Sequence, residues 1–175
     1  MLEHLWNGWR AAYVTGSTAD RPATAPGASV FTQILGSGLS DEDANIVHRG
    51  PLCFVIMNAF PYTSGHLMVL PYREVADLED LTADEATELW ATVTDAVATL
   101  KSAYRPEGVN IGVNLGQPAG GSVSQHLHVH VVPRWVGDAN FMTVVANTRT
   151  LPEALADSAA KVRAHWRRPN LDADV

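Results

Sequence analysis

Three histidines alternate with aliphatic residues in the segment QHLHVHVVP, at His126, His128 and His130. Successive side chains of a β-strand point to opposite faces, so a strand here would place all three imidazoles on one face and the aliphatic residues on the other. A buried imidazole needs a polar partner, and three of them in register are hard to explain as packing alone. The pattern therefore indicates a reactive site.

Two kinds of chemistry use such a cluster. Neutral imidazoles bind zinc, and a catalytic zinc site can use three of them. Alternate residues of a strand lie roughly 6–7 Å apart, however, and the segment 125–133 holds no Cys, Asp or Glu that would complete a ligand set. In nucleophilic catalysis, a neutral imidazole attacks phosphorus and holds the transferred group covalently, while flanking histidines orient it and donate protons. We favour this second interpretation and predict no metal site.

The loop before these histidines is suited to an anionic substrate. The segment GQPAGGS, at 116–122, is rich in glycine and follows Asn114 closely. Glycines let the backbone approach an anion, and successive backbone N–H groups can hold a phosphate. We therefore expect phosphate to bind at Asn114, Gly120, Gly121 and Ser122.

Short strands and one long helix are expected to position these residues. The apolar runs and their turn signals predict strands at 52–57, 66–70, 109–115 and 125–132, and a further one at 141–146. Thr82 and Glu85 form a capping-box pattern at the start of a helix that continues to about Tyr104. This order predicts an α+β fold, in which helices pack on one face of an antiparallel sheet.

The remainder of the chain completes one predicted domain, 1–175. We expect a short helix at 1–14, a loop or mobile linker at 15–29, a core at 50–147 and a C-terminal helix at about 151–167. A domain of 175 residues can bury a sizeable core.

Composition and charge narrow the possible partners and location. The net charge of −7 argues against nucleic acid or an anionic membrane as a partner. Cys53 is the single cysteine, and no basic leader or run of about 18 apolar residues occurs. These features predict a cytoplasmic protein.

At this point the motifs match a family. HLHVHVV resembles the signature of the histidine-triad (HIT) superfamily, His-x-His-x-His-x-x with apolar residues at x. Asn58 with FPYTSGHLMVLP, and Asn114-x-Gly with its Gly-Gly-Ser loop, resemble two further blocks of that superfamily in the same order. Over nearly the whole chain, the sequence resembles the mycobacterial-type diadenosine tetraphosphate phosphorylases, a branch of the superfamily.

The resemblance implies a fold, a reaction and alternatives to that reaction. The fold would be a five-stranded antiparallel sheet with a long helix and a C-terminal helix, paired as a homodimer or higher homo-oligomer. The reaction would convert diadenosine tetraphosphate and inorganic phosphate into ATP and ADP through a nucleotidyl-histidine intermediate. A hydrolase of dinucleoside polyphosphates or nucleoside phosphoramidates is the first alternative, and a nucleotide-binding module with little turnover is the second. No cofactor is expected, although a divalent cation could accompany the polyphosphate.

The resemblance also implies roles for individual residues. His128 would be the nucleophile and His126 would orient it, while His130 and His66 would line the site. The remaining assignments are Asn58 to the ribose, and Asn114, Gly121 and Ser122 to the phosphates.

Three assignments rest on position within the motifs. Ile56 and Met68 each lie two residues from a matched position, on the same strand faces, and are expected to sandwich the base. Trp135 either closes the site near the second nucleotide or packs as an ordinary core residue. Many relatives carry a zinc-binding cysteine pair before the first strand, but the comparable segment here, 29–32, has no cysteine, so no structural zinc is expected.

Overall fold

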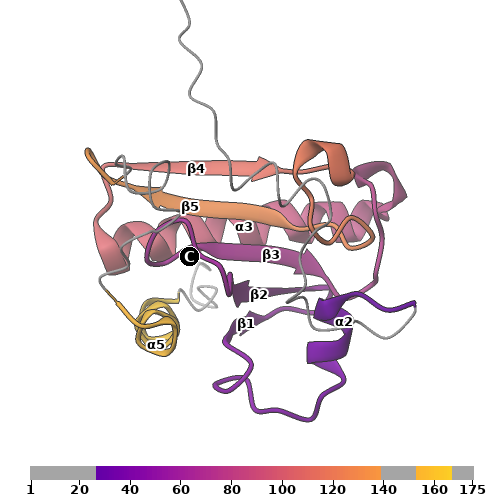
Figure 1. The fold of residues 1–175 in the computed structure, drawn as a ribbon, viewed down its shortest axis with the longest axis horizontal. Coiled ribbons are helices and arrows are strands. Elements are labelled where there is room, and N and C mark those ends of the chain that lie inside the picture. The colour runs from indigo at the N-terminus through magenta and orange to yellow at the C-terminus, as the bar shows by residue number, and fades with distance from the viewer. Residues whose placement is uncertain (1–26, 139–152, 167–175) are drawn as a thin grey trace, which may run out of the picture.

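A five-stranded antiparallel sheet forms the centre of the molecule in the computed structural model, which describes residues 27–138 and 153–166 (Figure 1). The strands are β1 (Ile46–Arg49), β2 (Cys53–Met57), β3 (Leu67–Pro71), β4 (Gly108–Val113) and β5 (Val129–Arg134). Their spatial order is β1-β2-β3-β5-β4, so the strand that carries the histidine pattern lies inside the sheet between β3 and β4. The predicted α+β fold with a five-stranded antiparallel sheet is confirmed.

One of the five strands differs from the prediction. No strand was predicted at 41–49, because most residues of this segment are polar, yet β1 pairs with β2 at one edge of the sheet. An edge strand tolerates polar residues because one of its sides faces solvent. The sheet therefore begins before residue 50, where the core was expected to start. The strand predicted at 141–146 and the helix predicted at 1–14 lie outside the described residues.

The strand β5 begins later than predicted and continues past the expected end. His126 and His128 precede its first residue, Val129, and Pro133 lies within it. Proline is tolerated there because β5 pairs with β3 only between Val129 and Val131 and has only β4 beside it at Pro133. The triad segment thus enters the sheet at its third histidine.

The long helix α3 (Ala83–Tyr104) packs on one face of the sheet, behind it in Figure 1. Both hydrogen bonds of the predicted capping box form between Thr82 and Glu85, and Arg105 ends the helix in a left-handed conformation. The apolar residues on one side of α3 are buried against the strand residues that face the helix. This core cluster includes Leu89, Val93, Ala96, Leu100, Val55, Val69, Leu127, Val129 and Val131.

The C-terminal helix α5 (Leu155–His165) packs beside α3 and forms the second part of this layer. It is shorter than the predicted 151–167, of which residues 151, 152 and 167 lie outside the described residues. Arg163 joins α5 to the sheet edge, since its Nε donates to the carbonyl oxygen of Ile46 at 2.9 Å.

The opposite face of the sheet carries a short helix that the sequence analysis did not predict. The helix α2 (Val30–Leu35) begins at Ser29, whose Oγ accepts the N–H of Thr32. Phe31 packs there into a second apolar cluster with Phe54, Ile56, Met68 and Leu70. The expectation that helices cover only one face is therefore wrong for α2. A helix of six residues is too short to give a periodic sequence signal.

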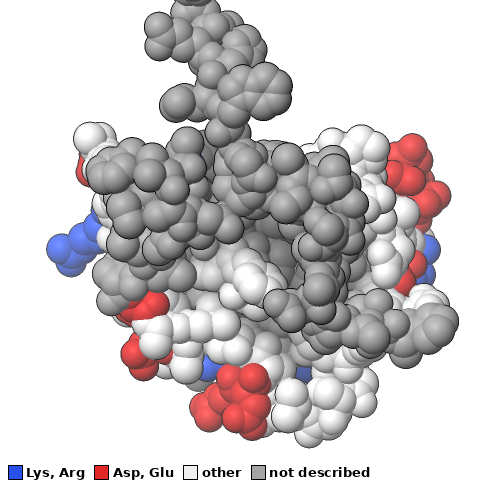
Figure 2. All heavy atoms as spheres, viewed as in Figure 1, with Lys and Arg blue, Asp and Glu red and all other residues white. Residues whose placement is uncertain are grey.

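Charges are distributed unevenly over the face shown in Figure 2. Acidic side chains gather at its lower rim, over the loop that carries the exposed residues Asp41, Glu42 and Asp43, while Lys and Arg lie scattered at its margins. Within 27–138 and 153–166, none of the helices has the length and apolar character needed to cross a membrane.

Candidate active site

The four histidines predicted to act together are brought together by the sheet. His130 lies in β5 directly opposite Met68 of β3, and His66 immediately precedes β3. Nε2 of His66 lies 3.0 Å from Nδ1 of His130, and the rings of His128 and His130 are 4.9 Å apart between centroids. His66 and His126 are fully buried and His128 is 5% exposed. The rings of His66, His128 and His130 form one connected cluster, which His126 joins through its backbone carbonyl.

The hydrogen bond of His128 determines which of its nitrogens can react. Its Nδ1 lies 2.8 Å from the carbonyl oxygen of His126. A carbonyl oxygen only accepts hydrogen bonds, so Nδ1 carries the proton, and Nε2 of the neutral ring keeps its lone pair. A neutral imidazole held in this tautomer is suited to nucleophilic attack.

A second chain of hydrogen bonds fixes the proton on His130. The backbone N–H of Tyr62 donates to Nδ1 of His66 at 3.1 Å, so the proton of neutral His66 is on Nε2. That N–H donates to Nδ1 of His130 at 3.0 Å. Neutral His130 therefore carries its own proton on Nε2. The cluster thus presents a nitrogen lone pair on His128 beside an N–H donor on His130.

His126 is held at both ring nitrogens. Nε2 lies 2.9 Å from the carbonyl oxygen of Pro71, which requires a proton on Nε2. Nδ1 lies 2.7 Å from Oγ of Ser29. Its ring is therefore committed to the protein, and the residue acts on His128 through its backbone carbonyl.

Burial keeps the three triad imidazoles neutral. It lowers the pKa of His126 and that of His128 below the ordinary value, and for His128 the nearby ring of His126 lowers the pKa further. Burial and the neighbouring His128 lower the pKa of His130 to about 4. Because burial disfavours the charged form of an imidazole, the lone pair of His128 stays available at a lower pH than that of an exposed histidine.

The residues predicted to bind the ribose and base lie beside this cluster. Asn58 follows β2; its Oδ1 accepts the N–H of Phe60 at 2.9 Å, and its Nδ2 lies 3.4 Å from the ring nitrogens of His66. Ile56 and Met68 are directly opposite each other on β2 and β3. They therefore form one continuous apolar surface within the second apolar cluster, where Ile56 is 3% and Met68 6% exposed.

The glycine-rich loop returns to Asn114 and leads into the triad. A Cβ atom on Gly121 would lie 3.0 Å from the carbonyl oxygen of Gly116 and 3.2 Å from that of Asn114, so any other residue would crowd the loop backbone. The N–H groups of Gly120 and Gly121 donate within the loop, to Gln117 and Gly116. In this conformation these two N–H groups stabilise the turn, and the absence of a side chain on Gly121 lets its backbone lie close to the backbone of Gly116 and Asn114. Ser122 is exposed at the end of the loop.

Trp135 is not brought to the histidines. It follows β5, and its ring contacts Tyr104 of α3 at 6.3 Å between centroids. This contact places it with the helix layer, consistent with the packing alternative left open by the sequence.

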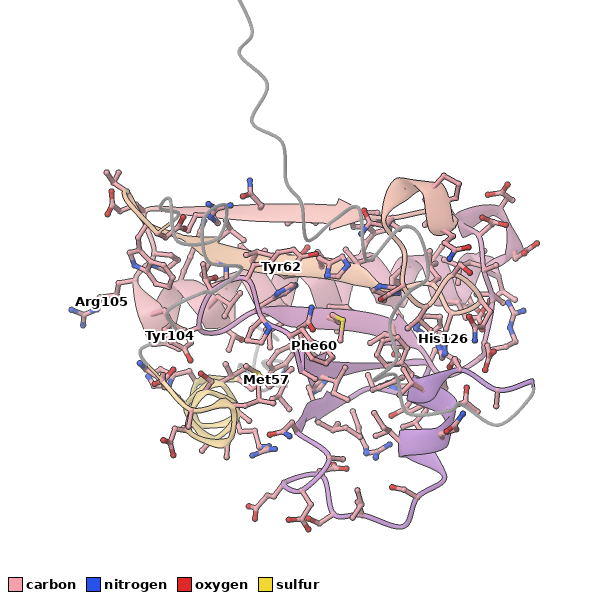
Figure 3. The ribbon with its side chains drawn as sticks, in the orientation of Figure 1. Met57, Phe60, Tyr62, Tyr104, Arg105 and His126 are labelled. Atoms are coloured by element: carbon pink, nitrogen blue, oxygen red, sulfur yellow. The ribbon has the colours of Figure 1, made fainter. Side chains whose placement is uncertain are left out.

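Several neighbours of the histidines were missed by sequence reasoning. Phe31 of α2 contacts the rings of His126 and His128, at 5.6 and 5.5 Å between centroids. Tyr62 lies over the middle of the sheet in Figure 3 and contacts His66 at 4.5 Å, whereas His126 lies at the end of the sheet next to α2. Ser29 was placed in a loop and given no role. Only the block around Asn58, which contains Tyr62, carried a sequence signal.

No group of three or more His, Cys, Asp or Glu side chains within the described parts of the chain is arranged to hold a metal ion. The imidazoles are instead bonded to one another and to backbone carbonyls.

The site agrees with what the chain resembles. The HIT domain family model matches residues 40–136. An AP-4-A phosphorylase from Mycobacterium tuberculosis is 44% identical over 169 residues, which cover 95% of this chain and 86% of the relative. An asymmetrical bis(5′-nucleosyl)-tetraphosphatase from Schizosaccharomyces pombe is 34% identical over 54% of this chain and 52% of its own length.

A solved structure of a histidine triad protein is also similar to this chain. A zinc-bound histidine triad family protein from Mycobacterium smegmatis is 26% identical and superimposes with a TM-score of 0.65, over 79% of this chain and 93% of that one.

Proposed function

This chain belongs to the HIT domain family, and from that premise we propose that it is a nucleotidyltransferase that phosphorolyses diadenosine tetraphosphate to ATP and ADP. The site observation that carries the proposal is the tautomer of buried His128, whose Nδ1–H is held by the carbonyl oxygen of His126 and whose Nε2 keeps its lone pair. The choice of phosphorolysis rests on the 44% identity to an AP-4-A phosphorylase over 95% of the chain.

The first proposed step is an in-line displacement at phosphorus. Nε2 of His128 attacks the α-phosphorus of one adenosine, forming an N–P bond and breaking the bridging P–O bond. ATP leaves, and an adenylyl group stays on His128. The imidazole becomes cationic as the bond forms, and its Nδ1–H bond to the His126 carbonyl then becomes stronger. The Nε2–H of His130 is suited to donate to a phosphoryl oxygen, where negative charge develops.

The second proposed step regenerates the histidine. An oxygen of inorganic phosphate attacks the same phosphorus, the N–P bond breaks, and ADP leaves. Inorganic phosphate is thus a co-substrate and no other cofactor is proposed; a divalent cation would enter with the polyphosphate. Splitting one displacement into two steps is the usual advantage of covalent catalysis.

The remaining residues would bind the nucleotide. We propose Asn58 for the ribose, the apolar surface of Ile56 and Met68 for the base, and Asn114, Gly120, Gly121 and Ser122 for the phosphates. Trp135 lies away from the histidines of its own chain. A role near a second nucleotide would therefore require Trp135 of another copy in a homo-oligomer. His66 would orient His130, and His126 would orient His128.

We also propose that the chain forms a homo-oligomer and works in the cytoplasm. The strand β4 lies at one end of the sheet order, and Ile111 on it is 49% exposed, features that favour pairing into a homo-oligomer. The single cysteine is buried and free, which suits a reducing cytoplasm. The net charge of −7 speaks against a nucleic-acid partner.

The deciding experiment supplies diadenosine tetraphosphate with and without inorganic phosphate and separates the products by ion-exchange chromatography. ATP and ADP formed only with phosphate would support phosphorolysis. ATP and AMP formed without phosphate would make the chain a hydrolase, the alternative favoured by its similarity to the tetraphosphatase. No turnover would refute both, and nucleoside phosphoramidates would be tested next. If His128→Ala then changed neither turnover nor nucleotide affinity, the chain would be a binding module.

A further inference from the structure

A polar cluster outside the triad joins three distant segments of the chain beside α2. Oγ of Ser29 lies 2.7 Å from Nδ1 of His126. The backbone N–H of Ser29 donates to both carboxylate oxygens of Glu74, at 3.1 and 2.9 Å. The hydroxyl of Thr32 donates to the same carboxylate at 2.6 Å. Ser29 and His126 are fully buried, so the contacts between them are shielded from solvent.

The hydrogen atoms in this cluster can be assigned. Nε2 of His126 carries a proton because it faces the carbonyl oxygen of Pro71. Neutral His126 therefore accepts at Nδ1, and the hydroxyl of Ser29 donates to it. The same hydroxyl oxygen accepts the N–H of Thr32. Each polar side-chain atom in this series of hydrogen bonds, which leads from Glu74 through Thr32 and Ser29 to His126, thus has a partner.

Glu74 is the charged residue at the end of this series of hydrogen bonds. Burial raises its pKa, but the hydrogen bonds from Thr32 and Ser29 and the nearby His126 outweigh burial, and the pKa lies below the ordinary value. The group is therefore a carboxylate at neutral pH, and charge-assisted hydrogen bonds to it are stronger than neutral ones.

The ring of His126 is oriented by these hydrogen bonds, because the residue lies outside the sheet. The ladder of β5 starts only at Val129, so the carbonyl oxygen of His126 bonds to no neighbouring strand. That oxygen accepts Nδ1–H of His128 at 2.8 Å. The ring anchors of His126 at Ser29 and Pro71, together with the N–H of Leu127, which donates to the carbonyl oxygen of Val75 at 2.6 Å, therefore fix where the acceptor for His128 lies.

We propose that Ser29, Thr32 and Glu74 are positioning residues for nucleotidyl transfer, which fix His126 and, through its carbonyl oxygen, the reactive tautomer of His128. This inference rests on the proposed function. None of the three touches the reacting atoms; each acts through the next. Precise placement of a reacting group matters because a displacement of about 1 Å can reduce a rate roughly a hundredfold.

The test compares matched variants of the cluster. Glu74→Gln removes the charge, and Thr32→Val removes the hydroxyl at almost constant volume, while Thr32→Ser restores it. Glu88→Gln is the control, because Oε1 of Glu88 also accepts two backbone N–H groups, from Leu52 and Cys53, but on the helix face of the sheet. We expect Glu74→Gln and Thr32→Val to lower kcat about tenfold or more with KM within about threefold, and Thr32→Ser and Glu88→Gln to stay within about twofold of the unchanged protein. Circular dichroism gives the folded fraction of each.

A second readout does not require turnover. Correlation spectra of the ¹⁵N-labelled histidine rings show which ring nitrogen carries the proton. We expect a single Nδ1–H tautomer for His128 in the unchanged protein and a mixture of tautomers in Glu74→Gln and Thr32→Val.

Each other outcome overturns the inference. One such outcome is a kcat of Glu74→Gln and Thr32→Val within twofold of that of the unchanged protein. The others are an equal loss of kcat in Glu88→Gln, or a loss of kcat in the cluster variants while the tautomer of His128 stays unchanged. If the unchanged protein does not act on diadenosine tetraphosphate, the proposed function fails, and the ring spectra alone decide whether the cluster sets the tautomer.

Discussion

Replacing His66 by Gln or by Asn separates the two hydrogen bonds of its ring. The amide nitrogen of Gln reaches the position of Nε2, which donates to Nδ1 of His130 at 3.0 Å. The amide oxygen of Asn reaches only the position of Nδ1, which accepts the N–H of Tyr62 at 3.1 Å. His66→Gln therefore keeps the donor that fixes the proton of His130, and His66→Asn loses it.

The expected difference follows from one hydrogen bond. A buried acceptor left without a partner costs about 1–3 kcal/mol, and about 1.4 kcal/mol in an activation free energy is a tenfold change in rate. We expect kcat about tenfold lower in His66→Asn, because His130 then also populates the tautomer with its lone pair towards the substrate, and within about threefold of normal in His66→Gln. The assay is the initial rate of ATP formation from diadenosine tetraphosphate and phosphate at pH 7. Equal rates in the two variants would refute the assigned proton positions.

Three further outcomes follow from the same geometry. His128→Ala should lower turnover by about three orders of magnitude or more while the protein still binds nucleotide in equilibrium dialysis; normal turnover would require another nucleophile. Burial lowers the pKa of the triad histidines, that of His130 to about 4, so the unfolded chain binds more protons. The free energy of unfolding by urea should therefore fall as pH drops from about 6.5 towards 4, and a constant value would contradict neutral burial. Leu89→Ala, at a fully buried position of α3, should lower that free energy by about 2–5 kcal/mol and leave kcat of the folded protein within twofold; a larger kcat loss would show that the two sheet faces are coupled.

The features that the sequence predicted correctly are local. Alternation along the triad placed Leu127, Val129 and Val131 in the helix-side core, and the capping box at Thr82 and Glu85 formed as expected. Such signals lie within a few residues of one another, where periodicity and capping chemistry act. The roles assigned to the site residues stay predictions, although the histidines themselves lie together.

The features that it missed depend on contacts between distant segments. Ser29 and His126 are 97 residues apart, and neither their hydrogen bond nor the short helix α2 leaves a periodic trace. The start of β5 at Val129 depends on where β3 can pair with it. The glycine loop looked like a set of free N–H donors, but closing its own turn uses those of Gly120 and Gly121. Composition cannot reveal such competition.

The alternation from His128 into β5 has a consequence for how this protein tolerates substitutions. Odd-numbered positions such as Val129 and Val131 pack under α3, while His128 and His130 face the other way. In a saturation mutagenesis library, substitutions at Val129 and Val131 should therefore lower the abundance of the protein in the cell. Substitutions at His128 and His130 should instead lower the activity per molecule. A laboratory evolution campaign could then improve robustness from one set of positions and explore new substrates from the other, with little interference between the two searches.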